Sequence, residues 1–371
     1  MKQTNLEINN FEISYPLENL APLETIFFLD IETTGFTAKG SNLYLIGGAY
    51  YKNKTWNIIQ WFSENYSEEE KILNAFKNFA KDYSYFIHYN GNNFDIPYLK
   101  QKANILQLDF SFLDHAGLDL YRRISPYKSF YKLQNCKQKS IEKYLSINRK
   151  DTFHGGELIS IYHDYVTTPS NYALQTLLLH NADDMKGMLN ILPILSCSDL
   201  FNNSISVEKV QANVFTNYAG EKRKELYMQL KLKQALPKKT SVYADHCYFV
   251  CDKTKATLRV PIYETELKYF YANYSDYYYL PEEDTSIHKS VAIYVDPSRR
   301  KKAKASNCYT RHFSSYIQQW EIIKEPFFKK DFRSSDIYFE LTEDAKKDRK
   351  LFNSYANHIL QHMVIESKNN D

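Results

Sequence analysis

The chain has 371 residues, of which 43% are hydrophobic and 25% charged, with only 10 glycines and 11 prolines. This composition excludes a disordered or fibrous chain, and the length favours two domains because single cores rarely grow beyond about 250 residues. No run of about 18 apolar residues could span a membrane, and Met1–Glu7 lacks the layout of a signal peptide. We therefore expect a cytoplasmic protein that does not enter membranes, with its five scattered cysteines reduced.

Charge is distributed unevenly along the chain. Residues 201–371 hold 28 Lys and Arg against 22 Asp and Glu, a net charge of +6, which leaves 19 against 22, or −3, for residues 1–200. An acidic first part suits a metal site and a basic second part suits a polyanion, although this bias is too small to decide a function alone. We predict one domain over 1–200 and a basic, aromatic-rich α+β domain over 201–371, divided at the polar break Asn202–Ser204.

The first 200 residues alternate between apolar runs and helical patterns. Helices are predicted from Ser67 onward, at about 94–105 and over much of 133–195. Five strands are indicated by short apolar runs bounded by turn residues, at 26–29, 43–51, 56–62, 85–88 and 117–121. The order β-β-β-α-β-α-β-α predicts an α/β domain with a mixed five-stranded sheet flanked by helices.

Beyond residue 200 the pattern changes to short aromatic-rich strands and basic loops. Strands are predicted at 241–250, 256–263, 267–274, 277–280 and 337–341. Helices are predicted at 222–230, 285–295 and 343–364. No internal repeat is present.

Four acids and one histidine stand at positions that elementary geometry brings together. Asp30 and Glu32 lie two residues apart at the end of the first strand, so their side chains share a face and repel each other unless a cation lies between them. Asp95 opens the helix after the fourth strand, and His180 and Asp184 are one helical turn apart. Oxygen-rich sites of this kind suit Mg²⁺ or Mn²⁺, and two such ions can promote phosphodiester hydrolysis.

Three segments carrying these residues resemble, in order, the motifs of DEDD-type 3′-5′ exonucleases: Phe28–Gly35 (FLDIETTG), His88–Pro97 (HYNGNNFDIP) and His180–Met185 (HNADDM). More narrowly, Leu133–Leu145 and Gly155–Tyr162 are similar to the YprB-type ribonuclease H-like family. The resemblance covers about residues 24–195 and implies a ribonuclease H-like fold. Residues 201–371 resemble nothing to which a function can be attached.

The resemblance implies a role for each matching residue. Asp30 and Asp184 would hold the catalytic metal, Glu32 would assist the attacking water, and Asp95 would serve a second Mg²⁺ or Mn²⁺ ion. The substrate would contact residues beside these acids, namely Thr33, Asn90 and Phe94. Asn90 has an alternative role in shaping the turn, and nearby Asp119 is expected to be a solvated strand end.

The third motif departs from the family pattern. The two main exonuclease classes place either a Tyr four residues, or a His five residues, before the last acid, whereas here His180 precedes Asp184 by four. An imidazole at this position could accept the proton of the attacking water. Asp183 is an alternative last acid, and Asp184 is preferred because it shares a helical face with His180.

These features predict a nuclease that hydrolyses single-stranded DNA or RNA from its 3′ end with two metal ions, so its partner is nucleic acid. Two alternatives remain open. The unusual spacing of His180 allows a nucleic-acid-binding or assembly module with weak or no turnover, and an endonuclease of the ribonuclease H type would use the same acids.

The second domain offers two further patterns. Cys247, Cys251, Cys308 and His312 have the ligand types of a zinc site, but residues four apart on a strand lie about 13 Å apart, which favours buried thiols. Tyrosines between Tyr269 and Tyr279, with the basic residues of 299–304, could stack on bases and bind phosphates. A tyrosine-rich sheet core beside a solvated basic loop is the preferred interpretation, because aromatic residues favour strands in any case.

Overall fold

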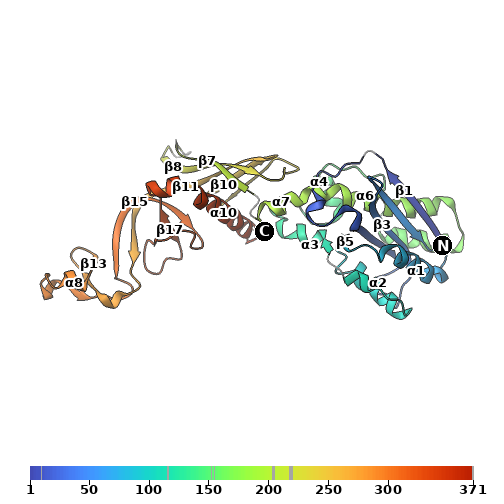
Figure 1. The fold of residues 1–371 in the computed structure, drawn as a ribbon, viewed down its shortest axis with the longest axis horizontal. Helices are drawn as coiled ribbons and strands as arrows, with labels where there is room; N and C mark the ends of the chain where they lie inside the picture. Colours follow the sequence, from blue (N-terminus) through green and yellow to red (C-terminus); the bar gives the residue numbers. More distant parts are fainter. Residues whose placement is uncertain are drawn as a thin grey trace. The chain divides into compact units, whose positions relative to one another are not determined.

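The computed structural model describes residues 1–9, 11–114, 117–151, 153, 155–202, 205–216 and 220–369. The chain divides into two compact units, Met1–Ser198 and Asp199–Asp371 (Figure 1). Of the polar break expected between two domains, Asn203 and Ser204 lie outside the described residues. Within the described part of the chain, no helix combines the length and apolarity needed to cross a membrane.

The first unit is built on one mixed sheet with the strand order β1-β4-β3-β2-β5-β6. The strands are β1 (Lys2–Ile8), β2 (Ile26–Thr33), β3 (Leu43–Lys52), β4 (Thr55–Phe62), β5 (Tyr85–His88) and β6 (Gly117–Asp119). β2, β5 and β6 run parallel, and the other pairs are antiparallel. The five predicted strands are present. β1 is an additional edge strand, which sequence analysis missed because its residues are mostly polar and exposed.

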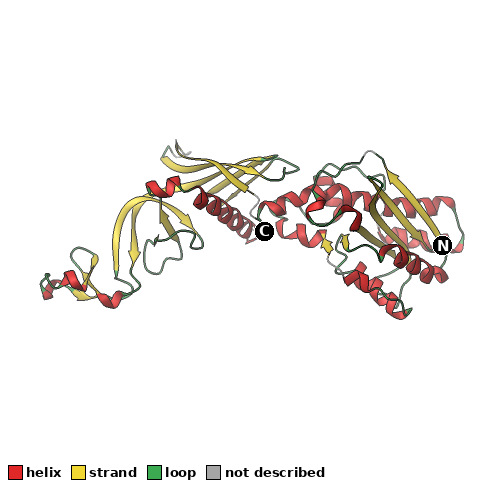
Figure 2. Cartoon of the chain, viewed as in Figure 1, coloured by secondary structure: helices red, strands yellow, loops and turns green. Residues whose placement is uncertain are grey.

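Helices cover both faces of this sheet (Figure 2). The main helices are α1 (Glu69–Ala80), α2 (Asp95–Ile105), α4 (Gln138–Tyr144), α5 (Gly155–Thr167) and α6 (Asn171–Ile191). One core cluster joins Phe27 to Phe76 of α1 and Leu99 of α2, and a second joins Tyr44 to Leu177 of α6. β2 is buried from Ile26 to Leu29 because both its faces are covered, and this explains its continuous apolar run. The predicted mixed sheet flanked by helices is confirmed.

The second unit contains an eight-stranded sheet and a small three-stranded sheet, β13-β12-β14. The strands of the larger sheet are β7 (Ile205–Thr216), β8 (Lys222–Leu232), β9 (Thr240–Ala244), β10 (Cys247–Asp252), β11 (Lys255–Phe270), β15 (Tyr309–Gln319), β16 (Phe327–Phe328) and β17 (Ile337–Glu340). The long strand β11 pairs with β8 and β10 through its first half and with β15 through its second. Helix α10 (Arg349–Asn369) packs against β7, β9 and β10 (Figure 1).

Several element predictions for the second unit were wrong. The predicted helix at 222–230 is strand β8, in which buried and exposed residues alternate from Leu226 to Leu232. The predicted strand at 241–250 is divided into β9 and β10 by Asp245 and His246, which both have positive φ. The two strands predicted over 256–274 are largely the single strand β11, which ends at Phe270.

The predicted helices near the end of the chain also changed. The helix expected at 285–295 is strand β13 (Thr285–His288) followed by the short helix α8 (Lys289–Ala292). The helix expected at 343–364 is α9 (Glu343–Lys347) and then α10, interrupted at Asp348. The small sheet also holds β12 (Tyr277–Leu280), which was predicted, and β14 (Lys301–Lys302).

Candidate active site

Strand β2 presents Asp30 and Glu32 beside helix α6. The Asp30 carboxylate accepts a hydrogen bond from Asn181 Nδ2 at 2.9 Å. Glu32 accepts a hydrogen bond from the Tyr44 hydroxyl at 3.4 Å, and its Oε1 lies 3.5 Å from Nε2 of His180. Both acids stand just beyond the apolar part of the strand and keep partial contact with solvent, so an ion or a substrate could reach them.

The third acid, Asp95, is the first residue of α2 and is buried. Its Oδ1 accepts a hydrogen bond at 3.1 Å from the backbone N–H of Ile31, which lies between Asp30 and Glu32. This bond ties the N-terminus of α2 to the strand that carries the other two acids.

The fourth acid and the histidine come from α6, as their spacing predicted. His180 Nε2 lies 3.1 Å from Asp184 Oδ2, and His180 Nδ1 donates to Asp151 Oδ2 at 2.7 Å. Asp151 is buried, so it fixes the orientation of the ring and directs Nε2 toward Glu32 and Asp184. Ligand atoms of Glu32, His180 and Asp184 all lie within 4.8 Å of one another.

Asp183 points away from this cluster. Its Oδ2 accepts hydrogen bonds from the backbone N–H groups of Lys150 and Asp151, each at 2.9 Å. Asp183 thereby anchors the loop that delivers Asp151 to His180, whereas Asp184 faces Glu32. The two adjacent acids thus have different surroundings.

A buried ion-pair network lies behind Asp184. Arg149 contacts Asp184 through Nη2, and its Nη1 lies 3.4 Å from Oε2 of Glu142. Helix α4, which carries Glu142, also donates a hydrogen bond from Gln138 Nε2 to the backbone oxygen of Asp184 at 2.9 Å. The Leu133–Leu145 segment therefore supports the part of α6 that holds the last acid.

Burial and mutual repulsion raise the pKa values of three carboxyls. The pKa of Asp30 is raised well above its ordinary value by burial and by the charges of Asp184, Asp95 and Glu32. Burial raises the pKa of Glu32 to about 7, although the charge of His180 opposes the shift. Burial likewise raises the pKa of Asp95 to about 7, against the hydrogen bond from Ile31. Without a cation, these acids resist ionising together.

The α6 pair shifts in the opposite sense. Burial disfavours the charged form of His180, but the hydrogen bond to Asp184 and the charges of Glu32, Asp184 and Asp151 outweigh it and raise the pKa to about 9. Burial would raise the pKa of Asp184, but His180 and Arg149 lower it below its ordinary value. His180 and Arg149 thus supply the positive charge of the site when no metal is bound.

Helix α6 approaches the sheet closely because Gly47 of β3 lacks a side chain. A Cβ at this position would lie 2.0 Å from Oδ1 of Asn181. Asn181 is fully buried, and its Oδ1 accepts a hydrogen bond from Gln60 Nε2 at 2.9 Å while its Nδ2 donates to Asp30. Gly47 and Gln60 therefore set the distance between the α6 residues and the β2 residues of the site.

The residues assigned to substrate contact have mixed surroundings. Thr33 donates its hydroxyl hydrogen to the backbone oxygen of Gly35 at 2.8 Å. Asn90 adopts positive φ, and its side chain accepts a hydrogen bond from Asn93 at 2.7 Å, as expected of a turn-shaping residue. Phe94 is half-buried, with its ring edge-on to Phe36, which is 91% exposed. Phe36 thus offers an apolar surface in the loop that follows Thr33.

Asp119 was expected to be a solvated strand end, and this prediction was wrong. Its carboxylate is buried and accepts hydrogen bonds from the backbone N–H groups of Asn90, Asn92 and Arg122. It caps the short helix α3 (Leu120–Ile124) and holds the 90–93 turn. Asp119 is therefore a structural residue that positions the second motif.

The tyrosine-rich region of the second unit is largely self-paired. Tyr271 stacks on Tyr277 with ring centroids 4.4 Å apart, and Tyr279 and Tyr309 both donate to Asp284. All five cysteines are buried and free. Within the described ranges, the one group of three or more potential metal ligands is that of the first unit, so the zinc interpretation gains no support.

Sequence reasoning missed four residues that complete the site: Asp151, Arg149, Asn181 and Glu142. They come from positions outside the acidic motifs or between their named residues, and only the packing of α4 and α6 brings them to the acids. Asn181, which lies between His180 and Asp184, could have been suspected from its position.

Residues 27–196 match the model of the RNase H superfamily. The first unit therefore has a ribonuclease H-like fold, as the resemblance implied. A search of the curated proteins finds no match.

Among solved structures, the chain is similar to the family B DNA polymerase of the archaeon Pyrobaculum calidifontis, with 16% identity and a TM-score of 0.39. It is also similar to E. coli exonuclease I in complex with a dT13 oligonucleotide, with 10% identity and a TM-score of 0.30. These alignments cover 47% and 56% of this chain. The chain spans 26% of the polymerase and 54% of the exonuclease.

Proposed function

We propose that this protein is a divalent-metal-dependent nuclease, specifically a 3′-5′ exonuclease acting on single-stranded DNA or RNA. The catalytic residues would be the four acids and the histidine of the cluster, Asp30, Glu32, Asp95, His180 and Asp184. The observation that carries the proposal is that these side chains, from three separate elements, converge where their charges perturb one another. The family match over residues 27–196 supports the nuclease class.

The donor set fits hard cations. Carboxylate oxygens are the ligands that Mg²⁺ and Mn²⁺ prefer, and the raised pKa values of Asp30, Glu32 and Asp95 show that positive charge is needed to ionise them together. We assign Asp30, Glu32, Asp95 and Asp184 as ligands of two such ions. When bound, the ions would lower the pKa of a water molecule and neutralise charge on the phosphate.

The protein residues would supply orientation and proton transfer. Asp151 holds His180 so that Nε2 faces Glu32 and Asp184, from where it could take a proton from the attacking water. Compensation of the Glu32 and Asp184 charges by cations removes the interactions that raise the pKa of His180, so the ring can act as a base near neutral pH.

The substrate-binding part of the proposal involves the loops beside the acids. Thr33 and Phe94 flank the cluster, and the exposed ring of Phe36 could pack against a terminal base. Asn90 contributes through the shape of its turn.

The narrower assignments belong to the same proposal. Membership of the YprB-type branch is supported by the Leu133–Leu145 segment, which packs α4 against α6 and contacts Asp184. We further propose that residues 1–200 form the catalytic domain, that residues 201–371 form an accessory domain, and that the protein acts in the cytoplasm.

A direct test pairs metal binding with cleavage. Mn²⁺ binding, measured by electron paramagnetic resonance, and nuclease activity should both be lost in Asp30→Asn and Asp184→Asn. Asp183→Asn is the matched control, because Asp183 bonds to backbone groups and can still accept as an amide. Cleavage that persists in Asp184→Asn but is lost in Asp183→Asn would overturn the assignment.

One observation favours a second candidate, a nucleic-acid-binding module without useful turnover. Arg149 already pairs with Asp184, so a fixed cation occupies part of the coordination that a metal ion would need. In that case the protein would bind oligonucleotides equally well with Mn²⁺ or EDTA and cleave neither DNA nor RNA. Mononucleotide products indicate the exonuclease, whereas a ladder of internal fragments would indicate a ribonuclease H-type endonuclease.

A further inference from the structure

One face of the larger sheet in the second unit has no covering element among the described residues. Along β10, Cys247, Phe249 and Cys251 are buried on the α10 side, whereas Tyr248 and Val250 alternate onto the opposite side. We call this opposite side of β8, β9, β10 and β11 the open face. Sheets with one solvated face normally carry small or charged residues there, so large rings on it call for an explanation.

A row of tyrosines and one arginine crosses the open face. The strand register places Tyr243 opposite Tyr248, Tyr248 opposite Arg259, and Arg259 opposite Tyr227. The Arg259 guanidinium lies over both flanking rings, 5.7 Å from the centroid of Tyr227 and 5.9 Å from that of Tyr248. Tyr243 is 66% exposed at the end of the row. Because neighbouring strands are about 4.8 Å apart, the row offers about 14 Å of aromatic and cationic surface.

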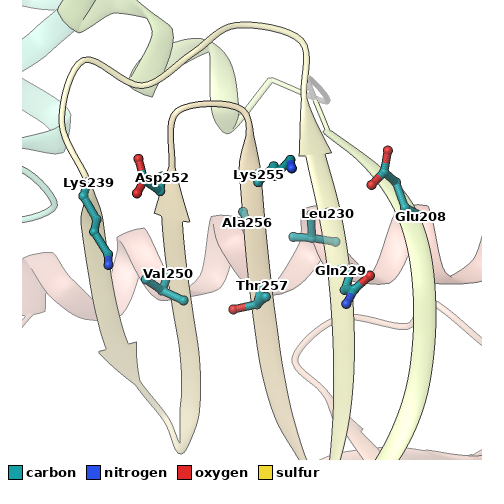
Figure 3. Close-up of a pocket in the computed structure, with 9 residues that line it drawn as sticks. All are labelled: Glu208, Gln229, Leu230, Lys239, Val250, Asp252, Lys255, Ala256 and Thr257. Atoms are coloured by element: carbon teal, nitrogen blue, oxygen red, sulfur yellow. The ribbon is translucent and has the colours of Figure 1, made fainter.

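The open face is also hollowed on both sides of this row. A cavity of about 480 Å³ is lined by residues that include Val250, Thr257, Gln229 and Lys255, and Figure 3 shows them on neighbouring strands with α10 behind. A second cavity of about 720 Å³ contains the arginine and two of the tyrosines, together with residues such as His246. The two cavities share β8, β10 and β11, so they form one continuous concave region of the sheet.

The charge of this region suits a polyanion. Six cations line the face and its cavities: Arg223, Lys224, Lys231, Lys239, Lys255 and Arg259. Three acids accompany them: Glu208, Glu225 and Asp252. Arg223 and Lys224 pair with Glu221 and Glu264, but among the described residues Lys231, Lys239 and Lys255 form no ion pair.

We infer that the open face binds single-stranded nucleic acid, with bases stacked on Tyr243, Tyr248 and Tyr227 and phosphates held by Arg259 and the surrounding lysines. Planar rings next to cations favour this ligand over an acidic peptide, because every base offers a π-face to stack. The inference deepens the proposed nuclease function and rests on it for the role of the bound strand. It differs from the sequence prediction, which assigned stacking to the self-paired tyrosines between Tyr269 and Tyr279.

The test measures binding without cleavage. Fluorescence anisotropy of labelled dT20 and U20 with the full chain in EDTA should show affinity that falls at least about tenfold in Tyr243→Ala/Tyr248→Ala. Tyr243→Phe/Tyr248→Phe should bind like the wild type because it keeps both rings. Tyr294→Ala is the matched control, because Tyr294 is 86% exposed in the same unit and lies outside the open face. Arg259→Ala should reduce the slope of log affinity against log salt by about 1.

The outcomes separate this inference from the nuclease proposal. Loss of affinity in the alanine pair, with the phenylalanine pair and Tyr294→Ala unchanged, supports the open face even if no cleavage is ever seen. Unchanged affinity in the alanine pair overturns it even if the protein is an active nuclease. Displacement of dT20 by poly-glutamate at equal charge concentration would also overturn it, since the surface would then recognise charge alone. Circular dichroism of each variant excludes unfolding as the cause.

Discussion

Replacing Gly47 with alanine should force helix α6 away from the sheet and lower the free energy of unfolding of the first unit by about 3 kcal/mol. The added Cβ would lie 2.0 Å from Asn181 Oδ1, whereas ordinary contact begins at 3.4 Å, so the helix or the side chain must move by roughly 1.4 Å. Asn181 is fully buried and bonded to Gln60 and Asp30, so it cannot turn aside. Overpacking contributes about 1–3 kcal/mol, and each lost hydrogen bond about 1 kcal/mol.

Urea unfolding of Gly47→Ala, followed by tryptophan fluorescence, measures this effect. The background Trp320→Phe leaves Trp56 and Trp61, both in the first unit, so the signal reports that unit alone. Gly156→Ala is the control, because its Cβ would meet nothing within 4 Å. In an Asn181→Ala background, Gly47→Ala should cost under about 1 kcal/mol, since the obstructing group is gone. A cost below about 1 kcal/mol in the wild type, or strict additivity of the two substitutions, would refute the reasoning.

Three further predictions concern charge and packing. Asp151→Asn should lower kcat about 10- to 100-fold with little change in KM, because Asp151 orients His180 without touching the substrate; steady-state kinetics would contradict this role if only KM rose. In EDTA, stability should fall by about 2–4 kcal/mol from pH 5 to pH 9, because native Glu32 (pKa about 7, ordinarily 4.5) and native His180 (pKa about 9, ordinarily 6.5) keep protons that the unfolded chain has already released. Urea titrations across this range with and without Mn²⁺ test it, and a flat profile in EDTA would show that these protons are not coupled to folding. Burial raises the pKa of Cys247 and of Cys251 to about 12, so Ellman's reagent at pH 8 should label neither native thiol at more than about a thousandth of the rate of free cysteine, and fast labelling would disprove their burial.

The first unit was predictable because its signals are local. The apolar run of β2 is long enough to indicate a strand buried on both faces, and the spacing of His180 and Asp184 is one helical turn. Asp30 and Glu32 follow from the period of a strand. Each of these inferences uses residues at most four apart, a separation over which backbone geometry alone fixes relative positions.

The remainder of the site depends on contacts between distant segments. Asp151 meets His180 across 29 residues, and Asn181 meets Asp30 across 151, so neither contact has a local signature. Strand β8 shows the reverse problem. Its lysines, leucines and methionine favour a helix, but tertiary pairing with β7 and β11 determines its structure, and the alternating burial of Met228 and Leu230 was the signal to follow.

The most direct test of the central claim compares 3′-labelled and 5′-labelled single-stranded DNA and RNA during digestion with Mg²⁺ or Mn²⁺. The account predicts immediate release of label as mononucleotide from the 3′-labelled strand and stepwise shortening of the 5′-labelled strand. Both should be absent in EDTA, in Asp30→Asn and in Asp184→Asn, and both should be retained in Asp183→Asn. Intact oligonucleotides with either metal, under conditions where the protein remains folded, would contradict the assignment of this acidic cluster as a nuclease site.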